Sequence, residues 1–204
     1  MTIRTARRLG HHIHKGLMLV IDPSTGATGS AGFAVFDKGH LIDSGDIAVN
    51  RTDKTHKRLR EMSLLVNDYF DKEYTVLVLE QLEGGYAPKS LKGSIYVFQA
   101  SVDAKHYFEL VPKTWQAIAR VMSDWTEANK SDEYDAIWLG ISSIMYSFGW
   151  PESAKTRTKA GKLKMMEIIQ EYGPEFGWWG IPEIQAKWED ATEEDAYNLF
   201  KEKK

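Results

Sequence analysis

The chain has 204 residues, a length that suits one domain or one domain with a sizeable insertion. It contains no cysteine, which excludes disulfides and cysteine-ligated zinc and makes a reducing cytoplasm the expected compartment. Its formal net charge of -3 excludes an overall basic field, so any contact with nucleic acid has to come from local basic patches.

The apolar runs of the chain are short. Residues 17–21 and 76–79 are the longest, far below the roughly 20 residues that a membrane span needs. Arg4, Arg7 and Arg8 near the N-terminus are not followed by the apolar core of a signal peptide. We therefore expect a protein that neither enters a membrane nor is exported.

Residues 1–16 differ from the rest of the chain. They contain four basic residues, three histidines and no acidic residue. Two interpretations stay open: a basic N-terminal arm that contacts DNA phosphates, or a solvated leader. The remaining residues, 17–204, are expected to form the domain that carries the function.

That domain begins with a pattern of three short strands. An apolar run ends at Asp22, a turn rich in small residues covers 23–32, and a second apolar run occupies 33–36. A tight turn at 37–39 leads into residues 40–47. The pattern predicts an antiparallel meander.

Helices and strands then alternate. Residues 53–71 repeat apolar side chains every three or four positions, which predicts a helix. Residues 74–79 are a run of β-branched residues and leucine that ends at Glu80, typical of a strand buried on both faces. A Gly-Gly loop at 82–87, a helix from 88 to about 105 and a strand at 107–111 follow.

The second half of the chain is predicted to be helical. Residues 116–150 have helical spacing and predict one or two helices of an insertion, placed at about 116–152. Further helices are expected at 164–172 and at about 190–203, with a loop rich in Trp and Pro between them. The order βββ-α-β-α-β followed by helices predicts an α/β fold with a mixed sheet covered on both faces.

Three acidic residues stand where a site is expected. Asp22 and Glu80 each end a predicted strand, and Asp195 lies in the last predicted helix. Sites in open mixed sheets gather at the carboxyl ends of adjacent strands. Clustered carboxylates stay ionised when a divalent cation neutralises them, and Mg²⁺ prefers such oxygen ligands. The alternative is that each acid only forms a turn or caps a helix.

Four segments, in this order, resemble the motifs of the RuvC family of Holliday-junction resolvases. Residues 21–35 resemble the first strand with its Asp-Pro-Ser turn and a glycine-bearing second strand. Residues 78–81 resemble an apolar strand ending in Glu-Gln, and residues 110–115 the strand, proline and basic residue that follow. Residues 195–199 resemble the closing Asp-Ala of the final helix.

This resemblance implies a ribonuclease-H-like fold, with a mixed five-stranded sheet of three antiparallel and then parallel strands, helices on both faces and a helical insertion. It implies a homodimer whose subunits each nick one strand of a four-way DNA junction with Mg²⁺ or Mn²⁺. Asp22, Glu80 and Asp195 carry over as catalytic metal ligands. The N-terminal arm and the insertion are typical of phage-encoded members, whose compartment would be the host cytoplasm.

One ligand of the family pattern is missing from this alignment. The family has Asp or His three residues before the final Asp, and here that residue is Thr192, a poor ligand. Glu194 is the favoured substitute as catalytic residue and metal ligand. Asp190 is the other candidate, although residues 190–193 also form a capping-box pattern.

Basic and aromatic residues suggest where DNA binds. One stretch before a predicted helix places five positive charges within ten residues, at Lys155, Arg157, Lys159, Lys162 and Lys164.

Three further basic residues lie beside the predicted strand ends, and an aromatic residue in the Gly-Gly loop is a candidate for stacking on bases: Lys89, Lys92, Lys113 and Tyr86. The alternatives without a DNA-binding role are a solvated basic loop at 155–164 and a half-buried tyrosine at position 86.

Other interpretations stay open. The same scaffold could cut flap, RNA or RNA–DNA hybrid substrates, and Thr192 motivates a branched-DNA-binding protein without catalysis. Residues 22–26 also resemble a sugar-kinase phosphate loop, although such kinases need a second domain and a longer chain. Finally, residues 137–148 repeat apolar side chains at helical spacing, which fits either a dimer face or the core of one subunit.

Overall fold

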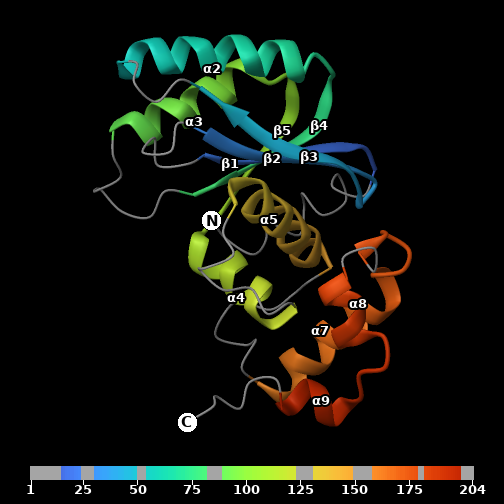
Figure 1. Ribbon diagram of the computed structural model, residues 1–204. Helices are drawn as coiled ribbons and strands as arrows, with labels where there is room; N and C mark the ends of the chain where they lie inside the picture. The colour runs from blue at the N-terminus through green and yellow to red at the C-terminus, as the bar shows by residue number, and fades with distance from the viewer. Residues whose placement is uncertain are drawn as a thin grey trace.

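The computed structural model describes residues 15–23, 30–49, 54–81, 89–122, 131–148, 158–178 and 182–198. Five strands form one sheet: β1 (Leu17–Pro23), β2 (Ser30–Asp37), β3 (His40–Ala48), β4 (Tyr74–Glu80) and β5 (Ala104–Leu110). Their order is β3-β2-β1-β4-β5, with β2 antiparallel to β1 and β3, and with β1, β4 and β5 parallel. This confirms the predicted mixed five-stranded sheet of three antiparallel and then parallel strands (Figure 1).

The central strand β1 is apolar because both of its faces are covered. Side chains alternate across a strand, so Leu19 and Ile21 enter one core while Met18 and Val20 enter the other. All four side chains are fully buried. Asp22 follows in the same alternation and therefore points to the Met18 and Val20 side of the sheet.

The edge strand β5 begins earlier than its sequence suggested. Residues 104–106 were predicted to end a helix or to precede the strand, yet they already pair with β4. An edge strand leaves one side open to solvent, so exposed Lys105 and Tyr107 are tolerated there while Phe108 and Leu110 are buried. Because the first residues of β5 include Lys105 and His106, this part of the strand does not form the apolar run by which a strand is recognised in a sequence.

Two helices cover one face of the sheet. They are α2 (Thr55–Tyr69) and α3 (Lys89–Ser101). Met62 and Val66 of α2, together with Ile95 and Phe98 of α3, pack in one core with Leu19 and Ile21 of β1. This agrees with the amphipathic spacing read from residues 53–71.

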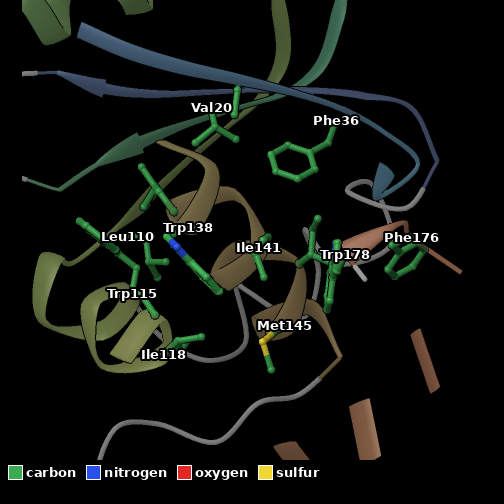
Figure 2. Close-up of a cluster of buried hydrophobic side chains, with 14 of the residues drawn as sticks. Val20, Phe36, Leu110, Trp115, Ile118, Trp138, Ile141, Met145, Phe176 and Trp178 are labelled. Atoms are coloured by element: carbon green, nitrogen blue, oxygen red, sulfur yellow. The ribbon is translucent and has the colours of Figure 1, made fainter. Parts of the chain in front are cut away.

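The opposite face carries α4 (Pro112–Met122) and α5 (Asp132–Ser147). α5 lies within the segment expected to be an insertion, but it packs against β1, β2, β3 and β4. Figure 2 shows Trp138, Ile141 and Met145 of α5 beneath Val20 and Phe36 of the sheet. Because α5 covers this face, it belongs to the main core of the fold.

The helical spacing of residues 137–148 therefore reflects the core and not a dimer face. Ile141, Ile144 and Met145 are fully buried within this subunit. Close packing on the sheet requires Gly140, where an added Cβ would lie 2.2 Å from the Phe36 ring.

The C-terminal helices are α7 (Lys159–Tyr172), α8 (Pro182–Trp188) and α9 (Glu193–Asn198). α7 begins before the predicted residue 164 because Thr158 caps it, accepting a hydrogen bond from the backbone N–H of Gly161 at 3.1 Å. α8 lies in a segment predicted to be a loop. The segment between α7 and α8 reaches the sheet at the β2–β3 turn, where the Trp178 indole donates to the Gly39 carbonyl at 3.3 Å.

No helix in the described part of the chain is long and apolar enough to cross a membrane. The first fourteen residues, which make up most of the predicted N-terminal arm, lie outside the described residues.

Candidate metal centre

The candidate site begins with a row of residues across the end of the sheet. Asp22 of β1 pairs with Gly32 of β2, and Gly32 pairs with Asp46 of β3. On the other side, the last pair of β1 and β4 joins Ile21 with Leu79, so Glu80 follows next to Asp22. The two predicted strand-end acids are therefore neighbours, as expected for adjacent parallel strands.

Asp22 and Glu80 meet two further acids from the start of α5. Asp22 is only 7% exposed. Burial raises its pKa well above the ordinary range, and the nearby carboxyl groups of Glu80, Asp135 and Asp132 raise it further. A side-chain hydrogen bond with Glu80 acts in the same direction. Asp22 at the end of β1 therefore lies within electrostatic range of three other carboxyl groups, one from β4 and two from α5.

The start of α5 is held in place by contacts with the strands. Ser131 caps the helix by accepting from the Tyr134 backbone N–H at 3.0 Å. The Ser30 hydroxyl donates to Asp132 at 2.5 Å, and the Ser44 hydroxyl donates to Glu133 at 2.6 Å. These bonds orient the first turn, which carries Asp132 and Asp135.

The Asp46 side chain supports the same turn by accepting a hydrogen bond from the backbone of the turn. The Glu133 N–H donates to an Asp46 oxygen at 3.0 Å, a favourable position for a carboxylate because helix N-termini carry partial positive charge. Burial and the Asp132 carboxylate raise the pKa of Asp46, and the hydrogen bond from Glu133 opposes this. Asp46 is thus a fifth acid beside the cluster, engaged in holding α5.

Gly32 permits this close approach. A Cβ added at residue 32 would lie 1.8 Å from the backbone oxygen of Asp132 and 2.4 Å from the backbone nitrogen of Glu133. Only a residue without a side chain fits between the sheet and the end of α5. Glycine here is therefore a packing requirement of the acidic site.

Glu80 has a second partner besides Asp22. The indole N–H of Trp115 donates to Glu80 Oε1 at 2.8 Å. Trp115 belongs to α4, which starts directly after β5, and is 1% exposed.

The structure does not bring the other two predicted site residues, Glu194 and Asp195, to Asp22 and Glu80. Both are exposed and lie on α9, which packs against α7 at the end of the helical layer far from the sheet (Figure 1). Asp195 accepts hydrogen bonds from the Thr192 backbone N–H at 2.9 Å and from its hydroxyl at 2.6 Å, which lowers the pKa of Asp195. The pair forms a capping box at the start of α9.

This pair also corrects the predicted capping box at residues 190–193. Asp190 is exposed in the turn before α9, and the cap is Thr192. The Asp-Ala pair at 195–196 therefore belongs to the N-terminal cap of α9, which Thr192 and Asp195 form.

A signal for Asp132 and Asp135 was present in the sequence. Residues 132–136 read Asp-Glu-Tyr-Asp-Ala, which contains an Asp-Ala and an acid three residues before it. The RuvC family pattern has an acid or histidine at this spacing, three residues before the final Asp, whereas Asp195 has Thr192 there. This segment was assigned to an insertion because of its helical spacing. In the structure the start of α5 lies against Gly32 of β2, and Gly32 pairs with Asp22 of β1.

The predicted DNA contacts are only partly within the described residues. Lys92 lies half-buried in the first turn of α3, and Lys164 is exposed and paired with Glu167 at 3.1 Å. For four other residues the structure describes the helical backbone but not the side chain: Lys89, Lys113, Lys159 and Lys162. Tyr86, Lys155 and Arg157 lie outside the described residues.

The acids fit a hard divalent cation by their chemistry. Within the described ranges, no group of three or more acidic or histidine side chains is already arranged around a metal position. All four donors are nevertheless carboxyl groups, and Asp22 is buried among like charges, a condition that a cation relieves. Asp22, Glu80, Asp132 and Asp135 are thus the residues that would hold Mg²⁺ or Mn²⁺.

No family model and no curated protein sequence matches the chain. Two similar solved structures are both RuvC from Thermus thermophilus. One, in complex with a Holliday junction substrate, is 11% identical, has a TM-score of 0.47 and covers 66% of this chain and 94% of its own. The other is 10% identical, has a TM-score of 0.43 and covers 65% and 95%.

Proposed function

We propose that this protein is a metal-dependent endonuclease that cuts branched DNA, with four-way junctions as the preferred substrate. The observation that carries the proposal is the meeting of Asp22, Glu80, Asp132 and Asp135 at one edge of the sheet. Asp132 and Asp135 take the roles that the sequence motif had suggested for Glu194 and Asp195. The preference for junctions rests on the RuvC-like order of the sequence motifs.

The four carboxylates would hold one or two Mg²⁺ ions, with Mn²⁺ as a substitute. Bound cations of this kind lower the pKa of a coordinated water and stabilise the leaving oxygen of a phosphodiester. The chain itself contributes the fixed orientation of the acids. Serine and backbone contacts hold Asp132, the Trp115 indole holds Glu80, and the buried end of β1 holds Asp22.

Charge also decides which substrates can enter. An acidic cluster repels phosphate unless cations and nearby basic residues offset it. Lys92 stands at the same edge of the sheet as Glu80, because α3 returns from the end of β4 toward the start of β5. Together with Lys89, Lys113, Tyr86 and the basic residues from 155 to 164, it is proposed to contact the DNA.

The test is a cleavage assay with Mg²⁺ on a synthetic four-way junction, a flap, a linear duplex and an RNA–DNA hybrid at equal salt. We expect junction cleavage at paired positions in opposite strands. Asp22→Asn should abolish cleavage and keep junction binding. Preferential cleavage of the flap or the hybrid would replace junctions with that substrate, and wild-type cleavage by Asp22→Asn would reject the site.

A binding protein without catalysis is now less well supported. That hypothesis was motivated by Thr192, and Asp132 supplies the acid that Thr192 lacks. Junction binding without a Mg²⁺-dependent product would revive it.

The remaining proposals follow from the sequence resemblance and from the composition of the chain. They are a homodimer, a cytoplasmic location, a phage-type origin, and a division into an arm (1–16) and a nuclease domain (17–204). Light scattering of the purified protein, alone and with junction DNA, tests the homodimer. A monomer under both conditions would contradict it.

A further inference from the structure

Trp115 touches the acidic site, and no part of the RuvC-like sequence motifs assigns it a role. Its indole N–H donates to Glu80 Oε1 at 2.8 Å, and its ring is 1% exposed. It lies one turn into α4, which follows β5 directly, and the backbone N–H of Trp115 donates to the Val111 carbonyl at 3.4 Å. Because Glu80 pairs with Leu110 at the end of β5, α4 starts beside Glu80.

Packing keeps the indole in this position. Trp115 belongs to the core formed by Leu110, Ile118 and Trp138, drawn together in Figure 2. A buried ring has little freedom to rotate, so its N–H points in one direction. Glu80, half-exposed at the end of a strand, gains a fixed orientation from a donor that is itself immobile.

The chemistry of the bond suits a metal ligand. Indole is only a donor, so it pairs with the carboxylate as an acceptor and favours its ionised form. A carboxylate has two oxygens and about four acceptor sites, so one N–H leaves Glu80 able to bind a cation as well. Supporting hydrogen bonds of this kind orient metal ligands in many proteins.

Other buried tryptophans show that packing alone does not require such a bond. Trp178 is equally buried and donates to the backbone carbonyl of Gly39, and the Trp138 indole nitrogen is buried without a hydrogen-bond partner among the described residues. An indole can therefore fill the core here without an acidic partner. The contact with Glu80 needs a separate reason.

We propose that Trp115 is a positioning residue that holds Glu80 ready to bind the divalent cation. This rests on the proposed function, because it presumes that Glu80 is a ligand. It goes further by assigning part of the cation affinity to a buried indole N–H on another element.

The test compares Trp115→Phe with Trp178→Phe, which also removes one buried indole and its hydrogen bond but lies at the β2–β3 turn. Mn²⁺ affinity is measured by calorimetry on the full chain without DNA. We expect Trp115→Phe to bind Mn²⁺ about 10- to 100-fold more weakly, the usual effect of losing a supporting contact. Trp178→Phe should bind Mn²⁺ as the wild type does, even if its melting temperature falls as much.

Equal Mn²⁺ affinity in Trp115→Phe and the wild type would overturn the proposal and leave the proposed function intact. An equal loss of affinity in both variants would also overturn it, because the effect would then be a general loosening of the core. If the wild type itself binds no Mn²⁺ and cuts no DNA, the proposed function fails first.

A second measurement applies if Trp115→Phe does not fold. The indole N–H resonance of Trp115 in the wild-type protein is followed by NMR during titration with Mg²⁺. It should shift along one saturating curve, while the Trp178 resonance stays in place. A Trp115 resonance that does not move while Mg²⁺ binds would overturn the proposal.

Discussion

Asp22 is an acid in a position that disfavours its charge. It is 7% exposed and faces three other carboxyl groups, so burial and repulsion both raise its pKa. Asp195 is the opposite case, an exposed acid whose pKa is lowered by two hydrogen bonds from Thr192. The ionised Asp22 therefore lowers the stability of the fold, as expected for an acid of a functional site. Asp195 stabilises the start of α9, as expected for a capping residue.

The first prediction concerns stability without a cation. Asp22→Asn removes the repulsion and should raise the melting temperature at pH 7 by about 2 °C or more, the shift expected for roughly 1 kcal/mol in a domain of this size. Asp195→Asn should lower it, because it weakens a cap. Thermal denaturation in EDTA measures both. A fall in melting temperature for Asp22→Asn would contradict the buried, repelled state of this acid.

The pH dependence of this difference has a defined sign. The folded protein holds the Asp22 proton more tightly than the unfolded chain, so its contribution to stability falls as pH rises above the unfolded pKa of about 3.9. The loss continues until pH passes the raised folded pKa. The advantage of Asp22→Asn should therefore grow from pH 4 upward, and an advantage that shrinks over this range would refute the assignment.

At the scale of elements, α5 is the helix that completes the site. Its first turn carries Asp132 and Asp135 and is held to β2 and β3 by Ser30, Ser44 and Asp46. α9 carries the same Asp-Ala letters but packs on α7. The position of a helix N-terminus relative to the sheet decides which acid can reach Asp22.

The second prediction separates the two helices by activity. Asp132→Asn and Asp135→Asn should each lower junction cleavage by more than the roughly 100-fold that loss of a supporting contact costs. Glu194→Gln and Asp195→Asn should cleave within about twofold of the wild type, since surface changes have small effects. Initial rates at saturating Mg²⁺ measure this. Loss of activity in the α9 variants alone would restore the motif first read from the sequence.

The third prediction concerns Gly32. Gly32→Ala places a Cβ against the backbone of Asp132 and should destabilise the protein by about 1–3 kcal/mol, the usual cost of forcing an added methyl group into a packed contact. Gly45→Ala is the control, because its Cβ would meet the side chain of Phe33 at 3.0 Å and not backbone. Urea denaturation measures both, and equal stability of Gly32→Ala and the wild type would contradict the close approach.

At the scale of the whole molecule, the sheet separates two cores and gathers the chemistry at one edge. β1 and β4 end at that edge, and α3 and α5 begin there. Exposed Lys72 lies at the opposite edge, between α2 and the start of β4. Basic residues near the acids should therefore affect DNA binding more than equal charges elsewhere.

The fourth prediction uses this contrast. Lys92→Gln should reduce the slope of log affinity against log salt for junction DNA by about 0.9, the value for one phosphate contact. Lys72→Gln, with the same change in charge, should leave the slope unchanged. Fluorescence anisotropy in Ca²⁺ at several salt concentrations measures the slopes. Identical slopes for the two variants would exclude Lys92 as a phosphate contact.

Much of this molecule was predictable from local patterns. The runs ending at Asp22 and Glu80 predicted adjacent buried strands, because continuous apolar runs of that length need cover on both faces. The alternation of strands and helices predicted a mixed sheet covered on both faces, and the family resemblance implied the directions of its strands. The sequence therefore predicted that Asp22 and Glu80 end neighbouring strands.

The other half of the site was decided by tertiary structure. Helices α5 and α9 each carry an Asp-Ala pair, and nothing local to Asp135 or Asp195 determines which of the two helices reaches the sheet. The choice depends on Gly32 opening space on β2, and on contacts that join residues about 90 to 100 positions apart, such as Ser44 with Glu133 and Ser30 with Asp132. Local sequence determined which residues could end strands and cap helices, and long-range packing alone determined which acids meet.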